Sequence, residues 1–78
     1  MEVTVTGAQL KAIRETFGLS ASAMGRALGY SGPKANIAVH IRRFERGDRR
    51  IPAPVGRLAL MFYREGIPKG WSASRGQI

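Results

Sequence analysis

Glycines at positions 18, 29, 47 and 66 each close a stretch in which apolar residues recur every three or four positions. That spacing places apolar side chains on one face of an α-helix, and glycine readily adopts the left-handed conformation that ends a helix. The pattern therefore predicts an all-α fold, a compact bundle of four to five helices. The third helix is expected from Pro33 or Lys34 to Arg46, and the fourth from Pro54 to Glu65.

Local patterns also predict where the helices begin and which faces they bury. Thr6 followed by Gln9 matches a capping box, Ser20 suits the N-cap of a short second helix ending near Leu28, and Pro33 suits the first position of the third helix. The apolar residues expected to meet in the core are Leu10, Ile13, Phe17, Ala23, Met24, Ala27, Leu28, Ile37, Ile41, Phe44, Val55, Leu58, Ala59 and Phe62.

A chain of 78 residues is long enough for one compact domain. We expect an extended N-terminal arm at 1–5, a helical domain at 6–66, and a C-terminal tail at 67–78 that takes part in dimerisation. The tail is expected to be loose from Lys69 to Ile78, with the exception of Trp71. A core of this size leaves only a few kcal/mol of net stability, which favours a homodimer. The expected dimer contacts are in the fourth helix, at Trp71, and at Met61 or Tyr63.

The net charge of the chain indicates which class of partner it binds. Thirteen Lys and Arg against five Asp and Glu give a net charge of +8, which favours polyanions, either nucleic acid or an anionic membrane. The alternative is a solvated basic surface, but the cations are clustered between positions 34 and 50. No apolar run approaches the roughly 20 residues that span a bilayer. The chain has no cysteine and its first residues lack a signal-peptide pattern, so a cytoplasmic protein is expected, with no membrane partner.

The predicted order is helix, short helix, glycine turn, basic helix, basic loop and helix, which is the layout of a helix-turn-helix domain. The stretches LKAIRETFGLS (10–20), SASAMGRALG (20–29) and IRRFERGDRRIP (41–52) resemble the Xre and phage Cro/repressor-type DNA-binding domains. The resemblance implies a lambda-repressor-like fold. It also implies a homodimeric transcriptional repressor whose third helix enters the major groove of a near-palindromic operator.

Counting back from Glu45, the resemblance places Ala38, Val39 and Arg43 where such domains contact bases. The planar fork of Arg43 matches guanine O6 and N7, and an apolar side chain suits a thymine methyl group. A second interpretation of Val39 is contact with the second helix or with a dimer partner. Two further candidates for base contacts, if the third helix begins early, are Asn36 and Lys34.

Other residues are expected to hold the DNA backbone. They are Ser20, Ser22, His40, Arg42, Arg46, Arg49 and Arg50. For Arg49 and Arg50 the alternative is a solvated loop, and for His40 it is ordinary packing. The resemblance also implies a scaffold salt bridge between Arg14 and Glu45.

The chain departs from the family at three points. Gly29 and Glu45 are 16 positions apart (45 − 29), about six more than the family shows across its turn and recognition helix. Ala21 stands where similar domains place a phosphate-contacting Gln. Gly25 replaces the usual Ala, at an expected cost of up to about 1 kcal/mol in helix propensity.

Other functional classes find little support. No nucleophile with a base, paired carboxylates or phosphate-cradling loop is evident, so no enzymatic activity, cofactor or small-molecule ligand is expected. His40 has no companion ligands, so no metal site is expected. The main alternative is a protein-interaction module of the same fold, an antitoxin-like partner or phage inhibitor whose basic face meets an acidic protein. Sequence-independent packaging of nucleic acid is weaker, because no aromatic platform for stacking bases is evident.

Overall fold

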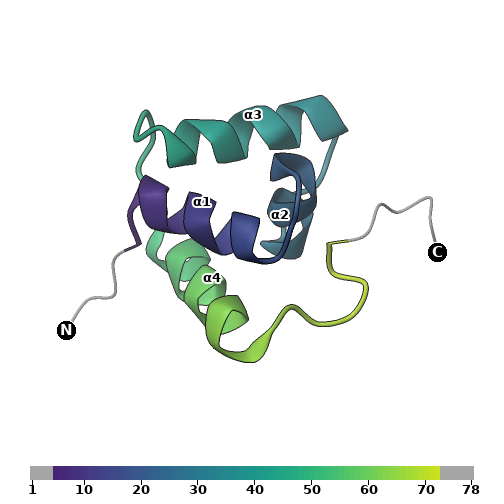
Figure 1. The fold of residues 1–78 in the computed structure, drawn as a ribbon. Helices are drawn as coiled ribbons and strands as arrows, with labels where there is room; N and C mark the ends of the chain where they lie inside the picture. Colours follow the sequence, from purple (N-terminus) through teal and green to yellow (C-terminus); the bar gives the residue numbers. More distant parts are fainter. Residues whose placement is uncertain (1–4, 73–78) are drawn as a thin grey trace.

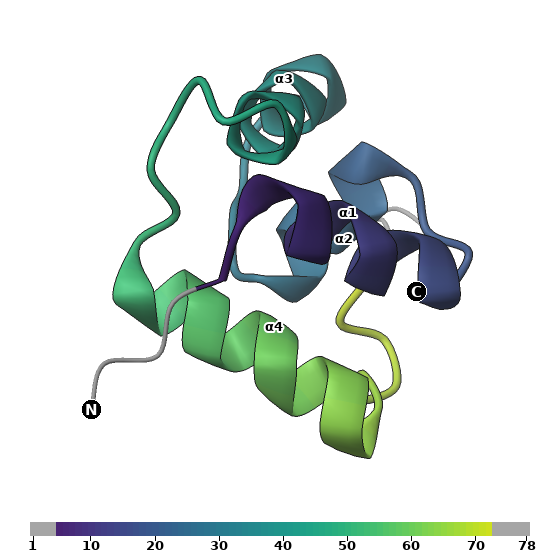
Figure 2. The same ribbon diagram turned by 60° about the vertical axis from the view of Figure 1, so that its left-hand side comes forward.

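The computed structural model describes residues 5–72, which form four α-helices and no strands. They are α1 (Gly7–Thr16), α2 (Ala21–Ala27), α3 (Lys34–Glu45) and α4 (Ala53–Glu65). α1 and α2 lie between α3 on one side and α4 on the other (Figures 1 and 2). The radius of gyration is 11.6 Å, close to the value of about 11 Å for a compact domain of this size. The all-helical prediction is confirmed for this part of the chain.

Two helices begin at the side-chain caps that the sequence predicts. The Thr6 amide donates to Gln9 Oε1 at 2.9 Å, and the Gln9 amide donates to Thr6 Oγ1 at 3.1 Å, which completes the capping box. At the start of α2, the Ala23 amide donates to Ser20 Oγ at 3.1 Å. Each bond satisfies an amide that the first helical turn would leave without a partner.

Prolines cap the other two helices without a side-chain hydrogen bond. Of the two predicted starts of α3, Pro33 and Lys34, Lys34 is the first helical residue and Pro33 is its N-cap, with ψ of 138°. In that extended conformation its carbonyl accepts the amides of Asn36 and Ile37, the first bonds of the helix. α4 likewise begins at Ala53, one residue earlier than predicted, with Pro52 as its N-cap. Proline fits both positions because its fixed φ is compatible with an N-cap.

The core contains side chains from all four helices and from the segment before α1. Its buried apolar residues are Val5, Leu10, Ile13, Ala21, Met24, Ala27, Leu28, Ile37, Ile41, Phe44, Ala59 and Phe62. Val5 was predicted to belong to an extended arm, but it is buried and contacts α4 at Gly56. The core therefore begins at residue 5, and the rest of the predicted arm, 1–4, lies outside the described residues.

Two glycines permit close approach between helices. A Cβ on Gly25 would lie 2.2 Å from Cγ2 of Ile37 and 3.1 Å from Cγ1 of Ile41, so α2 packs against α3 closely enough that only glycine fits. A Cβ on Gly7 would lie 2.3 Å from the Phe44 carbonyl oxygen, at the end of α3. The sequence interpretation of Gly25 as an unfavourable replacement for Ala was incomplete, because it considered helix propensity without the neighbouring helix.

The segment after α4 packs back onto the domain instead of leaving it. Ile67 is half-buried against the core, and the Trp71 ring meets the Phe62 ring edge-on, with centroids 5.9 Å apart. Trp71, the exception within the expected loose tail, packs on the domain, while Lys69 and Gly70 are exposed and 73–78 lies outside the described residues. Within residues 5–72, no helix has the length and apolar character needed to cross a membrane.

Candidate nucleic-acid interface

α3 has one buried face and one face directed to solvent. Its anchors are Ile37, Ile41 and Phe44, which are buried as the sequence predicted. On the opposite side, Ala35, Val39 and Arg43 follow each other at four-residue intervals and are all exposed, so they form one line along the helix, here called the outward ridge. Val39 is 45% exposed, an unusual environment for an apolar side chain within a helix. Val39 is not among the apolar side chains that pack against the core cluster.

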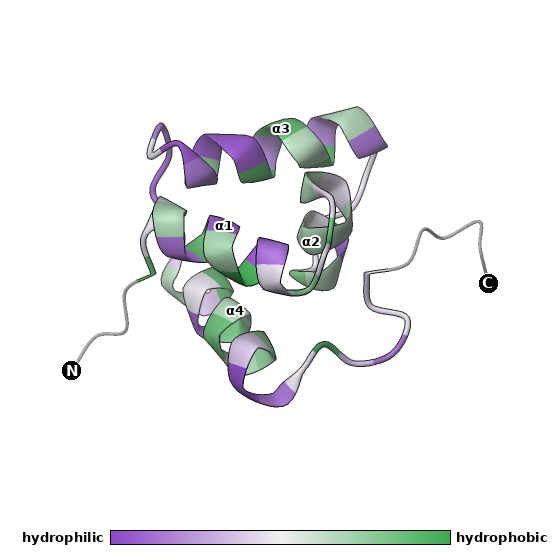
Figure 3. Ribbon diagram, viewed as in Figure 1, coloured by the Kyte–Doolittle hydropathy of each residue, from purple (hydrophilic) through white to green (hydrophobic). Residues whose placement is uncertain are grey.

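Three further predicted contacts on α3 lie beside the ridge and near its two ends. Lys34 and Asn36 are exposed in the first turn, and Arg42 is exposed beside the ridge in the last. The C-terminal half of α3 and the loop that follows form a hydrophilic surface (Figure 3). This surface ends at Arg49 and Arg50, which are both exposed in the loop.

The loop after α3 is attached to the helix by main-chain hydrogen bonds. The amides of Asp48 and Arg49 both donate to the carbonyl of Arg43, at 2.9 Å and 3.3 Å. Arg46 forms an ion pair with Asp48, with 3.0 Å between Nη2 and Oδ2, and both side chains are more than half exposed. An exposed ion pair of this kind is easily exchanged for another anion, so Arg46 stays available to a phosphate.

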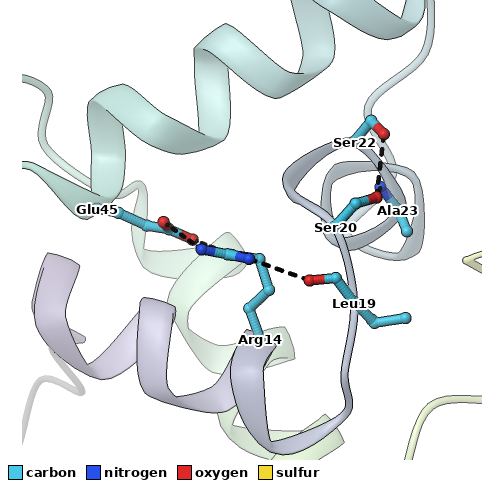
Figure 4. Close-up of polar contacts among 6 residues, drawn as sticks. All are labelled: Arg14, Leu19, Ser20, Ser22, Ala23 and Glu45. Atoms are coloured by element: carbon cyan, nitrogen blue, oxygen red, sulfur yellow. Dashed lines mark hydrogen bonds and ion pairs between the residues drawn. The ribbon is translucent and has the colours of Figure 1, made fainter.

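Beneath the surface, a half-buried ion pair joins α1 to α3. Arg14 Nε donates to Glu45 Oε2 at 2.6 Å, and Arg14 Nη2 donates to Glu45 Oε1 at 3.0 Å (Figure 4). A third bond runs from Arg14 Nη1 to the Leu19 carbonyl at 3.0 Å, which fixes the connection between α1 and α2. The hydrogen bonds to Glu45 raise the pKa of Arg14 despite its partial burial. The salt bridge implied by the resemblance is therefore present.

One cation on this side of the domain was missed by the sequence analysis. Lys11 lines a shallow hollow of about 280 Å³ together with Arg14, Arg42, Glu45 and Arg46. Because α1 packs under α3, the hollow adds a cation from α1 to the edge of the α3 surface. Lys11 precedes Arg14 by three residues and so shares its helix face, which is the signal that would have identified it.

The structure places three of the predicted contact residues away from an open surface. Ala38 is half-buried against the core, so it contributes little area to a ligand. His40 is also half-buried, with its ring edge-on to Tyr30 at 5.1 Å and to Phe44 at 5.6 Å. These contacts match the packing alternative for His40. No local pattern predicts these ring contacts, because Tyr30 lies in the connection between α2 and α3.

Ser22 is the third residue, and its side chain is buried. Ser20 and Ser22 lie together at the start of α2, with their hydroxyl oxygens 3.2 Å apart (Figure 4). Ser20 is exposed but already caps the helix. As placed here, Ser22 stabilises the first turn of α2 and offers no free hydroxyl to a phosphate.

Comparison of the chain with protein-family models, curated proteins and solved structures found no match. Function must therefore be inferred from the residues and geometry of the α3 surface. Among residues 5–72, no three His, Asp or Glu side chains are grouped so that they could hold a metal ion. The α3 surface displays positive charge at Arg42, Arg43, Arg49 and Arg50.

The partial burial of Tyr30 predicts that the stability of the fold depends on pH. Burial raises the pKa of the Tyr30 hydroxyl above its ordinary value of 10.0, although the positive charge of Arg49 partly opposes the shift. The folded protein then holds this proton to a higher pH than the unfolded chain does. Stability is therefore expected to fall as the pH rises above about 10. Urea denaturation of the wild type and of Tyr30→Phe between pH 8 and 11 measures the effect, and equal slopes for the two proteins would contradict it.

Proposed function

We propose that this chain is a sequence-specific, double-stranded-DNA-binding transcriptional regulator that acts as a homodimeric repressor. In this proposal α2 and α3 form a helix-turn-helix, and α3 enters the major groove. The observation that carries it is the outward ridge of α3, flanked by exposed arginines and held from beneath by buried side chains. A regulator of this kind would repress by occupying a promoter.

The dimensions of α3 support docking in a groove. A helix with its side chains is about 10–12 Å in diameter, which fits the B-DNA major groove of about 12 Å. With 12 residues, α3 is long enough to present several side chains to base edges. α1 and α2 lie on its buried side, so they do not obstruct approach to the ridge (Figure 2).

The ridge and its surroundings suit different parts of a duplex. Val39 and Arg43 lie one helical turn apart on the ridge, where side chains of an inserted helix reach base edges. Arg43 can donate two parallel hydrogen bonds to guanine, and Val39 can contact a thymine methyl group. Asn36 lies close enough to the ridge to read adenine. Arg42, Arg49 and the Lys11 hollow lie to the side, where the sugar-phosphate backbones would run.

Selection from a randomised duplex library tests the proposal directly. The purified protein is expected to enrich a defined motif, and to bind that motif more tightly than random duplex at physiological salt. Log affinity should fall linearly with log salt, with a slope of about 0.9 for each phosphate contacted. Enrichment of no motif, with equal affinity for all duplexes, would contradict a sequence-specific regulator. The DNA upstream of the gene itself is the first natural target to test.

Arg43 and Arg49 are expected to respond differently to alanine substitution. Arg43→Ala should cost on the order of 1–3 kcal/mol of binding free energy and relax base preference at one position of each half-site. Arg49→Ala should weaken binding to all duplexes about equally and reduce the salt slope by about 1. Gel-shift titrations on the selected motif and on its point variants measure both effects. Arg64→Ala, on α4, is the matched control for lost charge. A uniform loss in Arg43→Ala would instead assign Arg43 to the backbone.

A second candidate, a protein-interaction module, is favoured by one observation. Val39 is exposed between the small side chain of Ala35 and Arg43, so the ridge can also receive an apolar side chain of an acidic protein partner. Val39→Asp would weaken either kind of complex, so the substitution does not separate them. A competition experiment separates the two candidates. If the chain is a protein-interaction module, an acidic protein partner should displace a selected duplex from it. If the chain is a DNA-binding regulator, it should capture the duplex without any other protein.

A further inference from the structure

The Lys11 hollow, between α1 and α3, collects positive charge from both helices. It has a volume of about 280 Å³ and is lined by Lys11, Arg14, Arg42, Glu45 and Arg46. Pockets that enclose whole small molecules are usually larger, at about 300–1,000 Å³. The Lys11 hollow is therefore better suited to one small charged group.

The charges within the hollow do not balance. Its only carboxylate, Glu45, is already paired, because Arg14 donates two hydrogen bonds to it and its side chain is only 6% exposed (Figure 4). Lys11 and Arg42 are exposed, and neither forms an ion pair within residues 5–72. The hollow thus has cations on both sides and lacks an anion to balance them.

Arg46 is the third exposed cation of the hollow, and it is held by a partner that can leave. Its Nη2 lies 3.0 Å from Asp48 Oδ2, and the two side chains are 64% and 57% exposed. Arg46 Nε also donates to Asp48 Oδ2, at 3.1 Å. Because water competes for both groups, such a pair contributes little stability. An anion bound in the hollow would compete with Asp48 for the same guanidinium.

We propose that the Lys11 hollow is a binding site for one phosphate group, held by Lys11 from α1 and by Arg42 and Arg46 from α3, with Asp48 as an internal competitor for Arg46. Arg42 and Arg46 lie one helical turn apart on α3, so the group would be approached from two helices. Phosphate suits these side chains because its oxygens accept several charge-assisted hydrogen bonds, and arginine donates two of them in parallel. The group belongs either to the backbone of a duplex or to free phosphate, and only the first source rests on the proposed function.

A backbone phosphate in this site would fix the domain on DNA through a third helix. In the proposed function α2 and α3 form the helix-turn-helix, whereas Lys11 lies on α1. Contacts to phosphate position a protein on the duplex and contain no sequence information. Lys11 would therefore set affinity for DNA and have no part in base preference.

Inorganic phosphate titrated into the full chain without DNA tests the site itself. The NMR resonances of the arginine Nε–Hε groups are followed at constant ionic strength, with chloride as the reference anion. Those of Arg42 and Arg46 are expected to shift and then saturate. Lys11→Gln should weaken phosphate binding at least about fivefold. Lys69→Gln, at an exposed lysine outside the hollow, is the matched control and should leave phosphate binding unchanged.

Asp48→Asn is expected to act in the opposite direction. Removal of this carboxylate frees Arg46, so inorganic phosphate should bind about two- to fivefold more tightly. Glu65→Gln removes an exposed carboxylate from α4, away from the hollow, and should have no such effect. Circular dichroism checks that all the variants remain helical.

A random-sequence duplex then distinguishes the two sources of phosphate. If the group belongs to the DNA backbone, Lys11→Gln should reduce the slope of log affinity against log salt by about 1 and leave base preference unchanged. An unchanged slope, in a variant that has lost inorganic phosphate, would assign the site to free phosphate.

The phosphate titration does not depend on whether the chain selects a DNA motif, so the site and the proposed function can fail separately. Resonances that never saturate would overturn the site, because they would indicate general screening of the positive surface. So would a Lys11→Gln variant that binds inorganic phosphate as tightly as Lys69→Gln does. An Asp48→Asn variant that binds no more tightly than the wild type would overturn the role of Asp48.

Discussion

Replacing Glu45 with alanine is expected to lower the free energy of unfolding by about 3 kcal/mol. The Glu45 side chain is 6% exposed and that of Arg14 is 18% exposed, so neither group is well solvated. Without Glu45, the Arg14 guanidinium would keep only its bond to the Leu19 carbonyl, and its charge would stay half-buried without a counterion. A domain of this size has only about 3–5 kcal/mol of net stability. The variant should therefore keep no more than about 2 kcal/mol of net stability.

Urea denaturation followed by circular dichroism measures the loss, and the chain provides a matched control. Asp48→Ala removes the exposed ion pair with Arg46, which should cost less than about 1 kcal/mol. Arg14→Lys should give an intermediate loss, because an ammonium group keeps the charge but cannot form the two parallel bonds. If Glu45→Ala cost no more than Asp48→Ala, the pair would have no special structural role.

The second large effect is expected at Gly25, where alanine should destabilise the protein by about 1–3 kcal/mol. In an unobstructed helix the same change would stabilise by about 1 kcal/mol. Here the new methyl group would lie 2.2 Å from Cγ2 of Ile37, which is buried and β-branched and so has little rotamer freedom. α2 would have to move away from α3, and the cavity so formed would expose the core.

Two further variants isolate the steric cause. Gly56→Ala should be clearly less destabilising than Gly25→Ala, because its nearest contact is a Val5 side-chain carbon at 3.3 Å and Val5 needs to shift by only a few tenths of an ångström. Combining Gly25→Ala with Ile37→Leu should recover part of the loss, since leucine lacks the β-branched methyl group that the alanine meets. A Gly25→Ala variant as stable as the wild type would show that α2 and α3 do not pack this closely.

The helices could be predicted from sequence because their signals are local. Gly18 and Gly47 follow the helices they terminate, and the Thr6–Gln9 capping box begins α1 within four residues. The buried positions of α3 follow from helical periodicity alone. The Arg14–Glu45 pair joins residues 31 positions apart, so periodicity could not predict it; it came from the resemblance.

What sequence reasoning missed depends on contacts between distant segments. Val5 is in the core because it meets Gly56 on α4, and Gly25 is required because Ile37 lies against it. The burial of Ser22 and the ring contacts of His40 likewise depend on how α2 and its following connection are packed. Composition and local spacing contain no information about these distances, which are set only when the helices pack together.

Buried and solvent-facing side chains alternate along α3, so the exposed side of this helix can change in sequence separately from the core. Ile37, Ile41 and Phe44 face the core, while Ala35 and Val39 face solvent on the same helix. Substitutions at the solvent-facing positions leave the hydrophobic interior untouched, so they are tolerated at little thermodynamic cost. A library randomised there would vary the shape and charge of the α3 surface on a constant scaffold. Natural drift and laboratory evolution could thus retarget the protein without rebuilding it.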